Sequence, residues 1–388
     1  MNEKTGSKPK NRGFWGRVAS VAIFALIGAG CGGVMLRTVD GIDSFSGRVL
    51  CLIGLFAAMY GAILLQIIIH EAGHLLFGRL SGYGFGSFRI FSWIWIREEG
   101  RLTCRRLSLA GTAGQCLMVP PELKDGRMPV FLYNMGGALL NLIAAALFFG
   151  LSLLFRELPV LSVLLRMPTV VGLGVALLNG VPMRVGPVDN DGRNALALAK
   201  DTDAMRAFWV QMQVAAQTAR GVRLKDMPEA WFQLPPAETM QSGVTATLGV
   251  LAANRLMDQH RFREADELMA QLLELDSLMG LHRNMMLCDR IFMELIGAGR
   301  PEIVEGFRTR DFEKGLKTMR SLPSVLRTEY AQALLLEKDP EKAEKILAQF
   351  DVLTKTYPYP CEVEGERELM GIAREHVDPV LAHVADVE

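Results

Sequence analysis

The chain has 388 residues, enough for roughly two or three domains, and half of them are hydrophobic. Its 42 basic and 42 acidic residues give a formal net charge of zero, so bulk charge does not favour nucleic acid or another acidic partner. The mean hydropathy of +0.21 is high for a soluble protein. Long apolar runs are confined to residues 14–182, whereas residues 195–388 contain none long enough to cross a bilayer. We therefore expect a membrane part followed by a soluble part.

The N-terminal tail, residues 1–17, is basic and leads into an apolar run that ends in Gly28-Ala29-Gly30-Cys31. A lipoprotein cleavage site would place a branched aliphatic residue three positions before the cysteine. The presence of Gly28 there favours an uncleaved first span. The six cysteines are scattered and include no C-x-x-C pair, which fits a soluble part that faces the cytoplasm.

Four apolar segments are long enough to span a membrane, at about residues 18–36, 49–77, 129–155 and 158–181. The tail and the loop at 78–128 carry most of the Lys and Arg residues of this half, and the other two loops are short and contain few. Because positive loops stay on the cytoplasmic side, we expect a multi-pass protein of the cell membrane with both termini in the cytoplasm.

The second span contains His70-Glu71-Ala72-Gly73-His74 within an otherwise apolar helix. An H-E-x-x-H spacing places two imidazoles one turn apart on one helix face, where they can bind zinc. The glutamate between them can act as general base on a water that the zinc activates. Ionisable residues at membrane depth are costly and are rarely present without a function. Two helical histidines can also bridge within a core, so a zinc site needs a third ligand from elsewhere.

The later segments offer further polar candidates. An alternating aromatic run at 88–96 indicates strands at the membrane interface that shape access to the site, or an ordinary aromatic belt. The third span contains Asn141, and the fourth ends in a Gly/Pro-rich stretch with two acids, Asp189 and Asp191. Taken alone, Asp-Asn-Asp-Gly is typical of a surface turn, although non-helical backbone at depth is tolerated where it lines a polar cavity.

Together, these segments resemble the site-2 protease family (peptidase family M50) of intramembrane zinc metalloproteases. The likeness covers about residues 49–195 and rests on the HEAGH motif and on a later Asn-x-x-Pro element followed by Asp-Gly, here Asn179, Pro182, Asp191 and Gly192. It implies that Zn²⁺ is held by His70, His74 and Asp191. It also implies that Glu71 is catalytic and that Asn141 binds substrate or stabilises the oxyanion.

Two features depart from the family pattern. Ala138 replaces a proline in the element Gly137-Ala138-Leu139-Leu140-Asn141, and the gap from Pro182 to Asp191 is longer than in compact forms. Asp189 therefore stays a second candidate for the third ligand. For Asn141 the alternative is an interhelical hydrogen bond from a buried amide.

The soluble half consists of recurring amphipathic helices. Elements such as Phe262-Arg263-Glu264-Ala265 are typical of the second helix of a tetratricopeptide (TPR) hairpin, although the spacing is irregular, and a generic helical bundle is the alternative. Helical arrays of this kind bind a peptide or protein partner on a concave face.

The sequence therefore predicts an all-α protein with four parts. These are a cytoplasmic tail at 1–17, a membrane-embedded metalloprotease domain at 18–195, a linker at 196–240 and a TPR-like domain at 241–388. The membrane domain has about four transmembrane helices, with interfacial strands in the 80–120 loop.

By the resemblance, the protein hydrolyses peptide bonds of membrane-spanning or membrane-associated peptides near the cytoplasmic face. We expect it to contact a membrane-protein or peptide substrate, membrane lipid and a protein partner of the helical domain, and no nucleic acid. One alternative is a catalytically inactive membrane scaffold that recruits partners through its helical-repeat domain. The other is a transporter, which would need more spans and internal repeats.

Overall fold

The structure is a computed structural model that describes residues 14–98, 100–108, 112–185, 188–236, 240 and 242–377. The described chain is mostly helical, with one four-stranded sheet and one two-stranded ribbon. It divides into two compact units. The first contains the described residues up to 83 together with 128–201, and the second contains 84–127 and the described residues from 202 onward.

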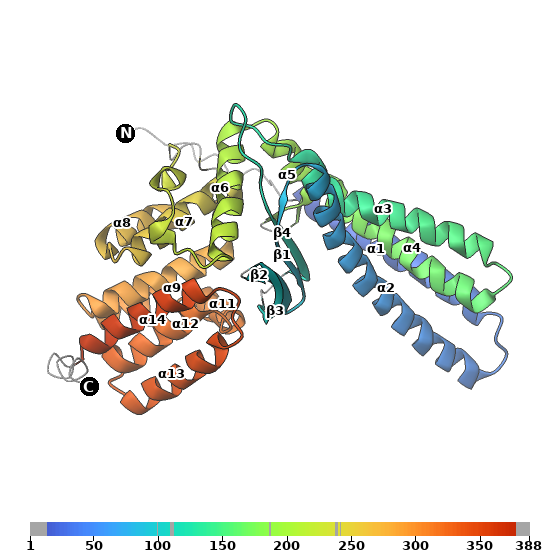
Figure 1. Cartoon of the computed structure of the whole chain (residues 1–388). Helices are drawn as coiled ribbons and strands as arrows, with labels where there is room; N and C mark the ends of the chain where they lie inside the picture. Colours follow the sequence, from blue (N-terminus) through green and yellow to red (C-terminus); the bar gives the residue numbers. More distant parts are fainter. Residues whose placement is uncertain are drawn as a thin grey trace, which may run out of the picture. The chain divides into compact units, whose positions relative to one another are not determined.

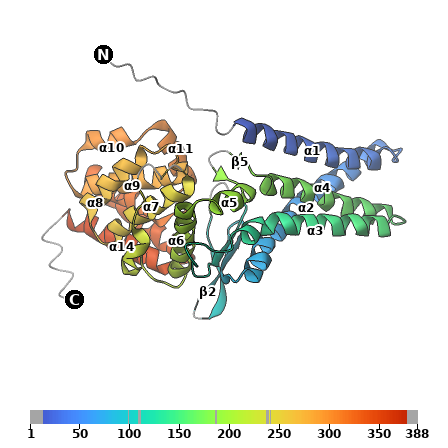
Figure 2. The same cartoon turned by 90° about the horizontal axis from the view of Figure 1, so that it is seen from above.

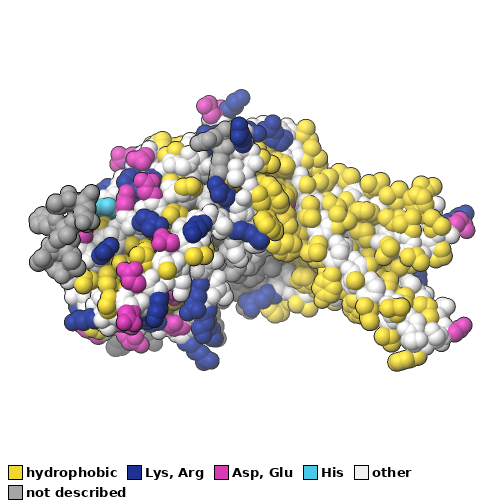
Figure 3. Space-filling model, turned by 60° about the horizontal axis from the view of Figure 1, so that its bottom comes forward, with side chains coloured by type: hydrophobic (Ala, Val, Ile, Leu, Met, Phe, Trp, Pro, Cys, Tyr) yellow, Lys and Arg dark blue, Asp and Glu magenta, His cyan; other side chains and the backbone are white. Residues whose placement is uncertain are grey.

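Four long apolar helices make up most of the first unit (Figure 1): α1 (Phe14–Val39), α2 (Phe45–Leu80), α3 (Phe131–Leu154) and α4 (Pro159–Gly180). Each is long and apolar enough to cross a membrane, as the sequence predicts. On the face shown in Figure 3, apolar side chains cover most of the surface of these helices, as expected of helices that face lipid. That these helices cross a membrane, and in which direction, stays a prediction.

Helices α2, α3 and α4 pack against one another, and α1 packs mainly against α4 (Figure 2). Glycines allow the backbones of α2 and α3 to meet closely, as small residues do between membrane helices. A Cβ atom at Gly73 would collide with the carbonyl oxygen of Gly136, and one at Gly137 would collide with the imidazole of His70. The closest approach of the two helices therefore lies at the HEAGH motif.

The chain bends sharply after α4, as its glycines and prolines predict. A two-residue ribbon, β5 (Arg184–Val185) and β6 (Val188–Asp189), leads into the short helix α5 (Asp191–Leu198). Helix α5 packs against α3 and α4. A Cβ atom at Gly192 would collide with the carbonyl oxygen of Gly180, so the first turn of α5 can lie against the end of α4 only because this residue is glycine.

The second unit begins with an antiparallel sheet in the order β3-β2-β1-β4, formed by β1 (Gly84–Ile90), β2 (Trp93–Glu98), β3 (Arg101–Arg106) and β4 (Gly114–Val119). Strands in the 80–120 loop are thus confirmed, and their place at a membrane interface stays a prediction. Ile94 and Ile96 are fully buried beside Tyr357, and β4 packs against α6 (Thr202–Thr218). Because of these contacts the sheet groups with the C-terminal helices, whereas the predicted boundaries placed it in the membrane domain.

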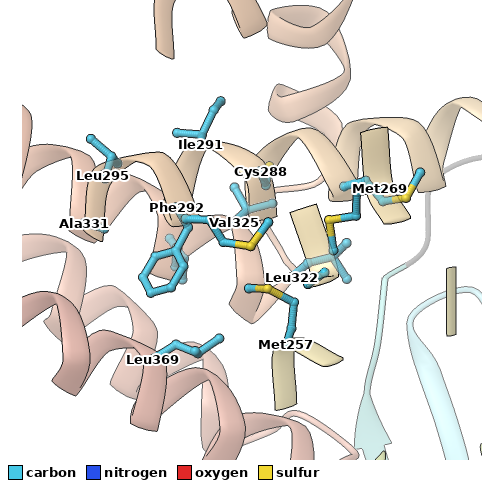
Figure 4. Packing of buried hydrophobic residues seen from close by; sticks show 14 of the residues in the cluster. Met257, Met269, Cys288, Ile291, Phe292, Leu295, Leu322, Val325, Ala331 and Leu369 are labelled. Atoms are coloured by element: carbon cyan, nitrogen blue, oxygen red, sulfur yellow. The ribbon is translucent and has the colours of Figure 1, made fainter. Parts of the chain in front are cut away.

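The remaining helices share one apolar core. They are α7 (Gly243–Asp258), α8 (Phe262–Leu273), α9 (Gly280–Ile296), α10 (Pro301–Phe307), α11 (Arg310–Thr318), α12 (Pro323–Ala331), the π-helix η4 (Gln332–Leu336), α13 (Pro340–Thr354) and α14 (Pro360–Glu375). Met257, Phe292 and Leu322 lie close together in this core (Figure 4). The TPR-like pattern of these helices stays a prediction.

The segment predicted as a linker contains folded structure. Helix α6 and two short 3₁₀ helices, η1 (Leu224–Asp226) and η2 (Glu229–Phe232), share a buried cluster with α7. Trp209 of α6 packs edge-to-face on Trp231, and its indole N–H donates to the carbonyl of Pro121 at 2.9 Å. These contacts extend the second unit to the start of α6.

Candidate metal centre

Helix α2 places the three polar residues of the HEAGH motif near its C-terminal end. His70, Glu71 and His74 are all buried. The two imidazoles lie one turn apart, with their ring centroids 4.8 Å from each other and their planes nearly perpendicular. The motif therefore presents two histidine nitrogens to one point, as its spacing predicts.

Asp191 supplies a carboxylate oxygen at the same point. Its Oδ2 lies 3.1 Å from His70 Nε2 and 3.4 Å from His74 Nε2, and the two Nε2 atoms are 3.2 Å apart. Within the described part of the chain, no other cluster of three or more His, Cys, Asp or Glu residues converges in this way. The structure thus brings together the three residues that the family resemblance assigns to zinc.

The hydrogen bonds of the imidazoles show which of their nitrogens are available. His70 Nδ1 lies 2.8 Å from Asn141 Oδ1, and His74 Nδ1 lies 2.8 Å from the carbonyl oxygen of Tyr133. Both partners are acceptors, so each Nδ1 carries the proton and each neutral ring directs the lone pair of its Nε2 inward. Two nitrogen lone pairs and a carboxylate oxygen then face one another, and only a cation between them relieves their repulsion.

Zinc satisfies this requirement. Ligands about 2.0–2.1 Å from a tetrahedral zinc lie about 3.3 Å apart. The three separations of 3.1 to 3.4 Å agree with that value. A proton shared among these three atoms is the other cation that would relieve the repulsion.

A buried amide network holds the first histidine. Asn141 is fully buried, and its Nδ2 donates to Gln66 Oε1 at 2.6 Å and to the Gln66 carbonyl at 2.9 Å. Gln66 Nε2 in turn donates to the carbonyl of Pro168 in α4 at 2.7 Å. In this arrangement Asn141 orients His70, which favours the interhelical alternative for this residue. A substrate-binding role for Asn141 stays a prediction.

Gln66 was not among the site residues predicted from the sequence. The sequence did contain a sign of its role: Gln66 is the one polar residue in the apolar run 61–69, and it lies one helical turn before His70. A Cβ atom at Gly172 would lie 2.6 Å from Gln66 Nε2, so α4 also leaves room for this side chain.

Asn190 fixes the position of Asp191, the candidate third ligand. Its Oδ1 caps α5 by accepting from Arg193 N at 3.1 Å and also accepts from Met183 N at 3.0 Å. Its Nδ2 donates to the carbonyls of Leu178 and Val181 at the end of α4. These four bonds anchor the residue immediately before Asp191, and nothing in the sequence motif singled it out.

Asp189 has different partners. Its Oδ1 lies 2.9 Å from Arg184 Nε and 2.9 Å from Arg193 Nε. Two ion pairs therefore hold it in the ribbon, apart from the histidine cluster. Of the two acids that the sequence offered as third ligand, Asp191 is the one that meets the imidazoles.

No protein-family model, curated protein or solved structure matches this chain. The support for a metal centre therefore lies in the geometry of the candidate ligands alone.

Proposed function

We propose that this protein is an intramembrane zinc metalloprotease of the site-2 protease type. The observation that carries the proposal is the convergence of His70 Nε2, His74 Nε2 and Asp191 Oδ2 among helices apolar enough to span a membrane. Three protein ligands leave one coordination position open, which is the arrangement of catalytic zinc sites, whereas structural sites use four protein ligands. The proposed substrates are membrane-spanning or membrane-associated peptides, cleaved near the cytoplasmic face.

Each residue has a role in the proposed reaction. Bound zinc would polarise a water molecule and the scissile carbonyl. Glu71, next to His70 on α2, would accept the proton of the attacking water on its carboxylate and deliver it to the leaving amine. A helical substrate must unwind locally, because in an intact helix the carbonyl group to be attacked accepts a backbone hydrogen bond.

The surroundings of the ligands support a catalytic site. Asn141 and the Tyr133 carbonyl fix the tautomer and orientation of the two imidazoles, as partners of zinc-binding histidines do. Rigid placement of this kind lowers the cost of organising the reacting groups. The packed helices around the site also limit contact with bulk water.

We also propose a topology and a role for the second unit. The Lys and Arg residues of the N-terminal tail and of the loop at 78–128 support cytoplasmic termini and a sheet near the cytoplasmic interface. The C-terminal helices would then lie in the cytoplasm and recruit a protein partner.

The decisive experiment compares membrane proteomes of cells that express the wild type or Glu71→Gln. We expect at least one membrane protein to be cleaved with the wild type and to stay full-length with the variant. Zinc content should be equal in the two purified proteins, because Glu71 is not a proposed ligand. Equal zinc together with identical proteomes would contradict the protease and favour the inactive scaffold.

A further inference from the structure

The C-terminal unit contains a cavity that the metal centre does not use. It encloses about 210 Å³ between α6, α7, α9 and α14. Much of its wall is apolar, formed by side chains that include Val214, Leu251, Met257, Met285 and Leu369. An apolar cavity with a few converging polar groups is the usual form of a small-ligand site. Because drug-sized sites enclose about 300–1,000 Å³, this one fits a single small group.

Four carboxyl groups line the cavity, and three of them have guanidinium partners. Asp258 lies 2.5 Å from Arg223 Nη2. Arg327, which is fully buried, bridges Asp289 and Glu366 and lies 2.9 Å from the latter. These guanidinium groups neutralise the three carboxylates, as charged groups in a protein interior require.

The fourth carboxyl, Glu362 at the start of α14, has a different environment. The hydroxyl of Tyr357 donates to its Oε2 at 2.7 Å, and no Lys, Arg or His in the described ranges forms an ion pair with it. Glu362 is an exposed residue that lines the cavity, but protein groups crowd its carboxyl, and this partial loss of hydration raises the pKa of Glu362 to about 7. The ionised form therefore lacks a counter-ion in a cavity that already holds three other acids.

We propose that this cavity binds a small organic cation, an ammonium or guanidinium group on a short apolar stem. The charged group would pair with the Glu362 carboxylate, and the stem would lie against the apolar wall. A cation is favoured over an anion because four carboxyls face the space and the guanidinium groups beside it are already paired. The inference does not depend on the metal centre.

The same chemistry is available from a free amine and from a Lys or Arg side chain of a peptide. Calorimetric titration of the purified full-length chain distinguishes them, with n-pentylamine, agmatine and a blocked Gly-Arg-Gly peptide as probes. Binding of the free amines alone identifies a metabolite site, and binding of the peptide as well identifies a site for a basic side chain. 1-Pentanol is the neutral control and should bind at least about tenfold more weakly than n-pentylamine.

Three variants locate the binding. Glu362→Gln keeps an acceptor for the Tyr357 hydroxyl and should weaken n-pentylamine binding at least about tenfold. Glu375→Gln, an exposed carboxyl at the end of the same helix, should leave binding unchanged. Should Glu362→Gln unfold, Asn254→Phe tests the site from α7 by filling the cavity, and it should also abolish binding.

The pH dependence of amine binding is a further test of the proposal. Ionisable groups facing Glu362 or its neighbours come from every element around the cavity: Arg223, Asp258, His260, Asp289, Arg327, Tyr357, Cys361 and Glu366. Because the amine needs ionised Glu362, its affinity should be about tenfold higher at pH 8 than at pH 6. The proposal is overturned if no probe binds, if 1-pentanol binds as tightly as the amine, or if folded Glu362→Gln binds normally.

Discussion

Replacing Asn141 by alanine tests whether the amide network supports the proposed metal centre. The side chain is fully buried, accepts from His70 Nδ1 at 2.8 Å and donates twice to Gln66. Asn141→Ala would leave the His70 N–H and the Gln66 oxygens without these partners. The imidazole would then be free to rotate or to change tautomer, and we expect zinc binding to weaken while both histidines and Asp191 remain in place.

The expected loss is about 10–100-fold in zinc affinity, the usual effect of removing an outer partner of a metal ligand. The hydrogen bonds give a consistent magnitude. A buried polar group left unsatisfied costs about 1–3 kcal/mol, and each 1.4 kcal/mol corresponds to about tenfold in affinity. Competition with a fluorescent zinc chelator measures the affinity directly in detergent-solubilised protein.

Asn134→Ala is the matched control. Asn134 lies two turns earlier on α3, is also buried, and donates within its own helix to the Val130 carbonyl at 2.8 Å. It should leave zinc affinity within about twofold, because it touches no ligand in the network. Equal losses in the two variants, or an unchanged affinity in Asn141→Ala, would refute the positioning role.

Three further predictions concern the ligands and the backbone around them. Asp191→Ala should remove most bound zinc and Asp189→Ala should retain it, measured by metal analysis; the reverse would move the third ligand to Asp189. Gly73→Ala should lower stability by about 1–3 kcal/mol in thermal unfolding, because α2 and α3 must separate, whereas Gly61→Ala meets no atom within 4 Å and should be neutral. Asn190→Ala should cost about 1 kcal/mol as a lost helix cap and weaken zinc binding, and normal zinc affinity would show that α5 is positioned without it.

Local sequence patterns were sufficient to predict the long apolar helices and the placement of the two histidines. Apolar runs of spanning length specified α1 to α4, and the fixed spacing of His70 and His74 placed both imidazoles on one face. The resemblance implied Asp191 as the third ligand, and the fold was needed to show which of Asp189 and Asp191 lies beside the imidazoles. Both acids lie in the same short stretch, and only their partners in space distinguish them.

The features that the sequence did not predict depend on packing between segments far apart in the chain. Gln66 contacts Asn141 and Pro168 from helices far away in the chain, so its role depends on how α2, α3 and α4 meet. The sheet at 84–119 groups with the C-terminal helices through Ile94, Ile96 and Tyr357, a contact across more than two hundred residues that no local period records. Helix α6 likewise became part of the second unit because its apolar face packs on α7.

The most direct test of the proposed zinc centre is the zinc-edge X-ray absorption spectrum of the purified protein. We expect equimolar zinc bound only by nitrogen and oxygen, with the multiple-scattering signature of two imidazoles from His70 and His74. A protein purified without zinc after expression in zinc-replete medium, or a spectrum with sulfur ligands from the cysteines, would contradict it.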